Sequence, residues 1–435
     1  MKITRRNPVV QTIYTSDPAP MVYKDTLYLY TGHDEDNSTW FTMNDWRCFS
    51  TKDMVNWTDH GSPLAYTDFS WARGDAWAGQ CIERNDIFYY YVPMNKKGGQ
   101  MAVGVAVSDS PTGPFHDPLG HPLVETETGD IDPTVYIDED GQAYLYWGNP
   151  HLWYVKLNED MISYDEKVGI VKVPLTEEGF GKRTGDSDRA TLYEEGPWFY
   201  KRNGLYYMVY AASGIPENIA YSTSTSPTGP WTYRGIIMPT EGGSFTNHPG
   251  IIDFKGNSYF FYHNGALAGG GGFTRSVCVE QFQYNADGTF PMLHMTEEGV
   301  TPVGTINPYI RNEAETIAWE QGIKTEPCTQ GGMNICHIDD GDFIKISNVD
   351  FGTYGPKSFR ACVSCSSNGG TMKIHMDSLD GILLGEITAT NTGSFNNWVM
   401  VETNVKNVTG IHDLYFTFHG DLTGNLFKVD YWNFQ

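Results

Sequence analysis

Acidic residues stand next to or near a proline at three widely separated places in the sequence. Asp17 lies in "SDPAP", Asp132 in "GDIDPTV" and Glu195 in "EEGPW". Two carboxyl groups flanking a bond are sufficient for acid–base hydrolysis, because one protonates the leaving oxygen while the other acts from the opposite side. A third carboxylate repels its neighbours and raises a pKa, which keeps one group protonated near neutral pH. A lone Asp-Pro usually caps its own turn, so this chemistry requires a fold that gathers three distant segments.

The three acids belong to a phrase that occurs five times. Each copy has a short strand, a polar turn and an aromatic strand, and the copies start at Asp17, Ala76, Asp132, Glu195 and His248, 53 to 63 residues apart. The turns are mostly good hairpin signals. They are Lys24-Asp25, Asn85-Asp86, Asp140-Gly141, Asn203-Gly204 and Lys255-Gly256.

This repeat predicts an all-β fold whose first part is a five-bladed β-propeller, with one four-stranded sheet per repeat. An array of β-sandwiches is the alternative, but it does not explain the fixed order of the phrases. In a propeller the innermost strands line the central axis, so equivalent positions at their starts converge. We therefore expect Asp17, Trp77, Asp132, Glu195 and His248 to face one small space.

The amino-acid composition limits the classes of ligand that the chain can bind. The formal net charge is -24, which disfavours nucleic acid and anionic membrane surfaces. Aromatic residues make up 14% of the chain, which suits either β packing or sugar binding.

We find no apolar run of membrane-spanning length. The basic N-terminus lacks the apolar core of a signal peptide, so a cytoplasmic protein is expected, or a secreted one if the sequence is trimmed. The seven cysteines lack a framework spacing and are expected to be free thiols.

With these motifs in place, residues 7 to 305 resemble glycoside hydrolase family 43. The resemblance implies a five-bladed propeller and hydrolysis with inversion at the anomeric carbon. It implies that Asp17 is the general base that activates water, that Asp132 tunes and orients the acid, and that Glu195 is the general acid. The neighbouring Asp130 and Glu194 are not expected to take these roles. Inversion places a water between two carboxyl groups roughly 6.5–9.5 Å apart.

The same resemblance suggests three further residues in the pocket. His248 is expected beside a calcium ion in the central channel, held largely through water, or as a buried core residue. Arg275, in "GGGGFTRSVCVEQF", is expected to reach the bound sugar, or else to form a surface salt bridge. Trp77 would form a wall of the pocket, although a core position would suit it equally.

The repeated phrases do not occur after residue 308. This change in the sequence pattern predicts two domains, at 1–308 and 309–435. Short strands and Gly/Asn turns in the second predict a β-sandwich (jelly-roll). Its segments resemble carbohydrate-binding module family 6, which implies a structural calcium held by Glu313, Glu315 and Asp430. Trp398 and Asn425 match that family's sugar cleft, but His337 stands where an aromatic is expected. The module therefore either binds sugar or braces the propeller.

Together these observations predict an inverting hydrolase that removes α-L-arabinofuranosyl residues from arabinoxylan or its oligosaccharides. β-Xylosidase activity on xylo-oligosaccharides, alone or combined with the first, is the close alternative. A non-catalytic sugar-binding protein is the alternative of another class. A retaining hydrolase or fructosyl transferase, with its first Asp as nucleophile, also remains open.

Overall fold

The chain is all-β. The computed structural model describes residues 1–186, 188–421 and 425–435, and its helical segments are α1 (Glu177–Phe180) and the short 3-10 turn η1 (Tyr66–Asp68). No helix in these ranges is long and apolar enough to span a membrane. All seven cysteines are buried free thiols, as expected from their spacing.

The first part of the chain forms antiparallel sheets, each built from consecutive strands. The first sheet contains β1 (Tyr14–Tyr23), β2 (Thr26–Asp34), β3 (Asp45–Thr51), β4 (Trp57–Asp59) and β5 (Leu64–Ala65), and the second contains β6 (Ala72–Gly74), β7 (Gln80–Arg84), β8 (Ile87–Lys96) and β9 (Met101–Ser108). The third contains β10 (Thr134–Ile137), β11 (Ala143–Trp147), β12 (Trp153–Leu157) and β13 (Val171–Lys172), and the fourth β14 (Tyr193–Arg202), β15 (Leu205–Ala212), β16 (Asn218–Ser224) and β17 (Thr232–Met238). The last contains β18 (Gly250–Phe254), β19 (Asn257–Asn264) and β20 (Ser276–Phe282).

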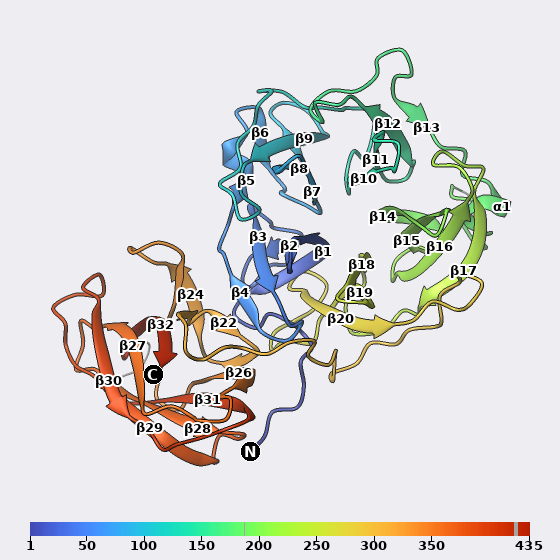
Figure 1. The fold of residues 1–435 in the computed structure, drawn as a ribbon. Coiled ribbons are helices and arrows are strands. Elements are labelled where there is room, and N and C mark those ends of the chain that lie inside the picture. Colours follow the sequence, from blue (N-terminus) through green and yellow to red (C-terminus); the bar gives the residue numbers. More distant parts are fainter. Residues whose placement is uncertain (187, 422–424) are drawn as a thin grey trace.

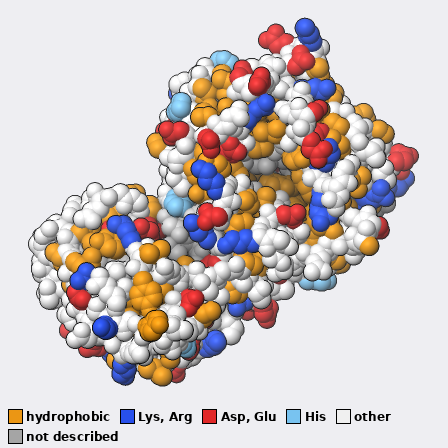
Figure 2. All heavy atoms as spheres, viewed as in Figure 1, with side chains coloured by type: hydrophobic (Ala, Val, Ile, Leu, Met, Phe, Trp, Pro, Cys, Tyr) orange, Lys and Arg blue, Asp and Glu red, His pale blue; other side chains and the backbone are white. Residues whose placement is uncertain are grey.

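These sheets stand in a ring around a common centre (Figure 1). Strand β1 contacts both β7 and β18, while β10 contacts β7 and β14. The strands that open the repeated phrases are therefore neighbours from one sheet to the next, and they form the inside of the ring. In Figure 2 the same face of the molecule is hollowed near the middle of the ring.

The predicted hairpin turns connect the first two strands of each phrase. Lys24 and Asn203, for example, adopt φ values of 55° and 50° in the turns that join β1 to β2 and β14 to β15. Gly204 has φ 77°, which a residue with a side chain rarely adopts. The turn chemistry thus fixes the register of the inner hairpins.

The C-terminal part forms two sheets. One contains β24 (Lys324–Pro327), β25 (Met333–Cys336), β32 (Lys428–Phe434), β27 (Ser358–Ser364), β30 (Val399–Asn404) and β21 (Asn312–Glu313). The other contains β23 (Trp319–Gln321), β26 (Phe343–Asp350), β31 (Ile411–His419), β28 (Gly370–Met376) and β29 (Ile382–Ala389). A single cluster of buried residues includes Phe359 and Trp432 from the first sheet and Phe416 from the second, so it is the core of this part.

The two parts of the chain are joined by more than a linker. The short strand β22 (Thr316–Ile317) pairs with β4, and so extends the first sheet of the ring. The Asn56 side chain donates to the Ser347 carbonyl at 2.8 Å and accepts from the Ser347 N–H, also at 2.8 Å. At the other end, Ile3 packs with Trp319 and Tyr415. The segments before β1 and after β20 therefore fasten the C-terminal part to the ring.

Candidate active site

One small cavity gathers the residues that open the inner strands. Asp17, Trp77, Asp132, Glu195 and His248 all line it. The cavity measures about 80 Å³. The remaining lining residues are Phe41, Met43, Ala78, Ile131, Thr246, Asn247 and Arg275.

Local backbone strain aims the acids into this cavity. Asp17 and Asp132 have φ values of 52° and 56°, in the left-handed region that Asp tolerates better than most residues. The register of β1 shifts between Ser16 and Ala19, and that of β14 shifts on both sides of Glu195. Because such bulges interrupt the alternation of side chains and re-aim them, Asp17-Pro18 and Glu195-Gly196-Pro197 mark the points where β1 and β14 depart from regular pairing, whereas Asp132 lies just before β10.

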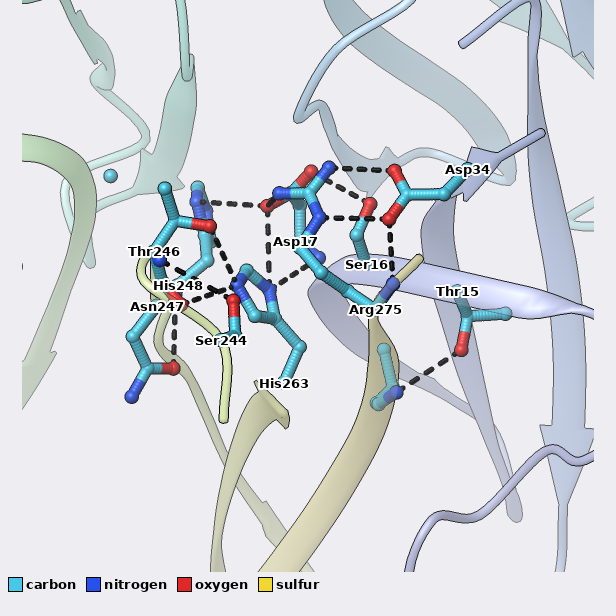
Figure 3. Close-up of polar contacts among 12 residues, drawn as sticks. Thr15, Ser16, Asp17, Asp34, Ser244, Thr246, Asn247, His248, His263 and Arg275 are labelled. Carbon is cyan, nitrogen blue, oxygen red and sulfur yellow. Dashed lines mark hydrogen bonds and ion pairs between the residues drawn. The ribbon is translucent and has the colours of Figure 1, made fainter. Parts of the chain in front are cut away.

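Asp17 lies among cationic and polar groups (Figure 3). Its Oδ1 is 3.2 Å from Arg275 Nη1, and its Oδ2 accepts from Ser16 Oγ at 2.9 Å. The Nδ1 atoms of His263 and His248 lie 3.5 and 3.8 Å from Oδ1. Burial by itself would raise the pKa of Asp17, but the charge of Arg275, helped by the hydrogen bond from Ser16, outweighs it and lowers the pKa below its ordinary value. Asp17 is therefore held as a carboxylate.

His263 is neutral. Its Nδ1 accepts the backbone N–H of Asp17 at 3.1 Å, and its Nε2 lies 2.9 Å from the Thr246 carbonyl oxygen (Figure 3). An unprotonated Nδ1 and a protonated Nε2 satisfy both contacts. Burial, together with the charge of Arg275, lowers the pKa of His263 to about 3. The imidazole therefore holds the strained backbone of Asp17 without adding charge to the site.

Arg275 is buried and held by two carboxylates, so the surface salt bridge considered for it is wrong. Its Nε and Nη2 donate to Asp34 Oδ2 and Oδ1 at 2.9 and 2.8 Å, and its backbone N–H also donates to Oδ2 at 2.8 Å. Its side chain lies over the ring of Phe41, 5.1 Å from the ring centroid. Asp34 thus fixes the guanidinium against Asp17 on one side and the pocket wall on the other.

The surroundings of Asp132 and Glu195 raise their pKa values, in contrast to those of Asp17. Burial raises the pKa of Asp132 well above its ordinary value, and the charges of Glu195 and Asp17 raise it further. Burial also raises the pKa of Glu195, with smaller contributions from Glu194 and Asp17. Asp132 Oδ2 accepts the N–H of Gly196 at 2.9 Å, which ties the two acids together. This pair therefore retains a proton at a pH where Asp17 is ionised, the arrangement needed for an acid and a base in one site.

Aromatic side chains build the wall and mouth of the cavity. The Trp77 indole N–H donates to the Phe41 carbonyl at 3.2 Å, and the two rings meet edge to face at 5.9 Å. Phe41 also packs on Phe273 at 4.9 Å. Beside them Trp40 is 60% exposed, so an apolar surface continues from the cavity to solvent.

Sequence reasoning missed several residues around this site. Asp34 lies at the end of β2, Asn149 follows β11, and Glu217 lies just before β16. Glu217 is buried and accepts the Asn247 N–H at 2.7 Å, while its Oε1 has no hydrogen-bond partner among the described residues. None of the three falls in the repeated phrase, so periodicity gave no signal for them.

The C-terminal part has buried carboxylates at its predicted calcium residues. Oε2 of Glu315 and both oxygens of Asp430 make no hydrogen bond within the described part of the chain, and such carboxylate oxygens suit a hard cation. Asp430 Oδ2 does, however, form an ion pair with Arg311 Nη2 at 3.5 Å. Burial raises the pKa of Glu315 well above its ordinary value. Glu313 differs, because its two oxygens accept from Arg311 at 2.7 and 2.8 Å. The residues present therefore fit a cation at Glu315 and Asp430, while Glu313 is engaged by its neighbour.

A second cluster of possible ligands lies outside the predicted sites. His33, Glu35 and Asp45 bring ligand atoms within 4.8 Å of one another, and theirs is the one such three-residue group among the residues described. Since His33 Nδ1 already lies 2.6 Å from Asp45 Oδ1, an internal contact accounts for this cluster. Within the described part of the chain, His248 belongs to no such three-residue group.

Comparison with known proteins identifies the families that the two parts of the chain match. Residues 5–290 match glycosyl hydrolases family 43, and residues 313–435 match carbohydrate binding module (family 6). The chain belongs to glycosyl hydrolase family 43. It is a glycoside hydrolase with a family 6 module, and structures of this hydrolase family are β-propellers. The resemblance found in the sequence is thereby confirmed.

Relatives of this family 43 hydrolase match it over most of its length. An arabinoxylan arabinofuranohydrolase of Bacillus subtilis (strain 168) is 34% identical, over 99% of this chain and 93% of its own. A xylosidase/arabinosidase of Bacteroides ovatus is 32% identical, over 66% of this chain and 96% of its own. The crystal structure of a family 43 arabinoxylan arabinofuranohydrolase from Bacillus subtilis, in complex with cellotetraose, has a TM-score of 0.86 at 32% identity, over 100% of this chain and 98% of that one.

Proposed function

We propose that this hydrolase removes α-L-arabinofuranosyl residues from arabinoxylan or its oligosaccharides, with inversion. The observation that carries the proposal is one small cavity lined by an ionised Asp17 and a proton-holding pair, Asp132 and Glu195. The arabinoxylan arabinofuranohydrolase of Bacillus subtilis, similar over nearly the whole chain, supports this substrate.

The roles follow from the electrostatics of the site. Asp17, kept ionised by Arg275, takes a proton from the attacking water. Glu195 gives its proton to the leaving oxygen, and the charge and burial of Asp132 keep that proton in the pair. Arg275 and His248 contact the sugar from the Asp17 side, and Trp77 forms the apolar wall. We assign the donor role to Glu195 rather than Asp132 because the family resemblance places the acid before Gly-Pro.

We also propose a finer description of the fold. The sheets of the ring, from β1 to β20, are the blades of a five-bladed propeller over residues 1–308, and the sheets of residues 309–435 form a β-sandwich. The successive contacts between first strands and the common core of the two C-terminal sheets support this division. The contacts of Asn56 and β22 across the junction favour a module that braces the propeller.

Calcium is proposed at two places. Glu315 and Asp430 would supply oxygen ligands to a structural ion, joined by Glu313 if it releases Arg311. Glu315 Oε2 and Asp430 Oδ1 are buried and have no hydrogen-bond partner among the described residues, which supports this site. A second ion would lie in the channel near His248, bound mainly through water. Its chemistry there would be to polarise water and to offset the negative charge of the pocket.

Product analysis on wheat arabinoxylan and on xylobiose, run side by side, tests the function. We expect free arabinose from the first and little xylose from the second. If xylose from xylobiose is the main product, β-xylosidase activity is supported instead. This is the second candidate function, because the Bacteroides ovatus relative is named a xylosidase/arabinosidase. Binding of both carbohydrates without any turnover would contradict the proposal in favour of a sugar-binding protein.

A further inference from the structure

The proposed acid, Glu195, is contacted by an amide from a neighbouring sheet. Asn149 Nδ2 donates to Glu195 Oε2 at 2.5 Å. The backbone of Asn149 is pinned, because its N–H donates to the Gly129 carbonyl at 3.0 Å. Gly129 has φ 60°, and an added Cβ would lie 1.6 Å from the Asn149 carbonyl oxygen, so only glycine permits this approach. Asn149 is thereby held beside the segment that carries Asp132.

An arginine decides which way this amide faces. Arg189 Nη2 donates to Asn149 Oδ1 at 2.7 Å. A guanidinium can only donate hydrogen bonds, so the oxygen of Asn149 must face Arg189 and the NH₂ group must face Glu195. Arg189 is itself held by Glu194, whose Oε1 lies 2.5 Å from Nη1. Arg183 contacts the other oxygen of Glu194 and completes the chain of contacts.

We infer that Asn149, oriented by Arg189, is a positioning residue that fixes which oxygen of Glu195 carries the transferable proton. Because Oε2 accepts a hydrogen bond from Nδ2, the proton of the neutral acid resides on Oε1. Loss of the amide frees the carboxyl group to rotate and to carry its proton on either oxygen. This inference rests on the proposed role of Glu195 as proton donor.

The test compares two leaving groups. An arabinoxylo-oligosaccharide leaves as a sugar alcohol and requires protonation, whereas 2,4-dinitrophenol leaves readily as an anion. For Asn149→Ala we expect kcat on the oligosaccharide to fall about 10- to 100-fold, part of the 10²–10⁴-fold effect of a general acid, with KM nearly unchanged. On dinitrophenyl α-L-arabinofuranoside we expect a loss below about 3-fold, since that step needs little acid assistance.

Further variants separate orientation from packing. Asn149→Asp keeps the shape but draws the Glu195 proton toward the new carboxylate, so it should lose oligosaccharide activity as Asn149→Ala does. Arg189→Ala should show a smaller loss with the same substrate dependence and add nothing to Asn149→Ala, because it acts through Asn149. Asn158→Ala is the matched control, since the exposed Asn158 donates through Nδ2 to Ser163 Oγ at 2.8 Å, and it should behave as the parent protein.

Each outcome decides the matter. Selective loss on the oligosaccharide in both Asn149 variants supports the inference. Equal loss on both substrates, or parental rates for Asn149→Asp, overturns it and leaves the proposed function standing. If the parent protein cleaves neither arabinofuranoside, the proposed function is wrong and the inference falls with it.

Discussion

Replacing Arg275 with Met should destabilise the catalytic part of the protein strongly. Arg275 and Asp34 are 3% and 0% exposed, and Asp17 is 6% exposed. The substitution would leave both carboxylates buried without a cation. Breaking such a buried pair costs about 3–5 kcal/mol. With an unfolding entropy of about 2.1 cal/mol/K per residue over roughly 300 residues, this corresponds to a fall of about 5–8 °C in the unfolding midpoint.

The deficit of this variant should also depend on pH. In the parent protein the pKa of Asp17 is lowered, so its contribution to stability is present above its ordinary pKa of 3.8 and is lost as pH falls through the folded value. Without Arg275 the burial of Asp17 is less opposed, which raises its pKa and makes ionisation destabilising. The difference between variant and parent should therefore widen as pH rises from about 3 to 7.

Thermal unfolding at several pH values, by calorimetry or circular dichroism, measures both effects. Arg234→Met is a matched control, because Arg234 donates to the Thr223 hydroxyl at 2.7 Å and contacts no acid of the site. Adding Asp34→Asn to Arg275→Met should recover part of the lost stability, since one buried charge is removed. A fall of less than about 2 °C in the unfolding midpoint, or a stability difference between variant and parent that does not change with pH, would mean that Arg275 does not stabilise the two buried carboxylates.

Three further predictions concern other parts of the molecule. Glu195→Gln should reduce kcat/KM on an arabinoxylo-oligosaccharide by about 10²–10⁴-fold with the fold retained in circular dichroism, and activity near the parental level would remove Glu195 from the reaction. Burial, reinforced by the charge of Glu195, raises the pKa of Glu217 well above its ordinary value, so the contribution of Glu217 to stability is lost as pH rises above about 4.5. The unfolding midpoint of Glu217→Gln should therefore rise relative to that of the parent protein from pH 5 to 8. A difference in midpoint that stays constant over this pH range would contradict this. Removal of calcium with a chelator should lower the unfolding midpoint, an effect that Asp430→Asn should reduce, and a midpoint indifferent to both calcium and chelator would exclude the proposed ions.

The sequence was sufficient to predict residues whose positions the repeat defines. Asp17, Trp77, Asp132, Glu195 and His248 occupy equivalent points of five phrases, and radial arrangement of the sheets brings equivalent points to one cavity. The turns were equally predictable, because Asn-Gly and Lys-Gly pairs impose a local geometry that needs no knowledge of the rest of the chain.

Residues outside the repeat could not be found in this way. Asp34, Asn149 and Glu217 reach the site from strand ends and loops with no fixed spacing from the phrase. Strand β22 has two residues, too few for a period, so its pairing with β4 left no trace in the sequence. Arg311, two residues before Glu313, competes for a carboxylate that the family resemblance assigns to calcium.

The most direct test of the proposed mechanism is proton NMR of the sugar released in the first turnovers from an α-L-arabinofuranoside. If Asp17 activates water while Glu195 protonates the leaving oxygen, the first-formed arabinose is the β-anomer, and the α-anomer appears only later by mutarotation. Initial release of the α-anomer would mean that a carboxylate attacks the sugar itself, and that Asp17 and Glu195 do not act as the base and acid of an inverting reaction.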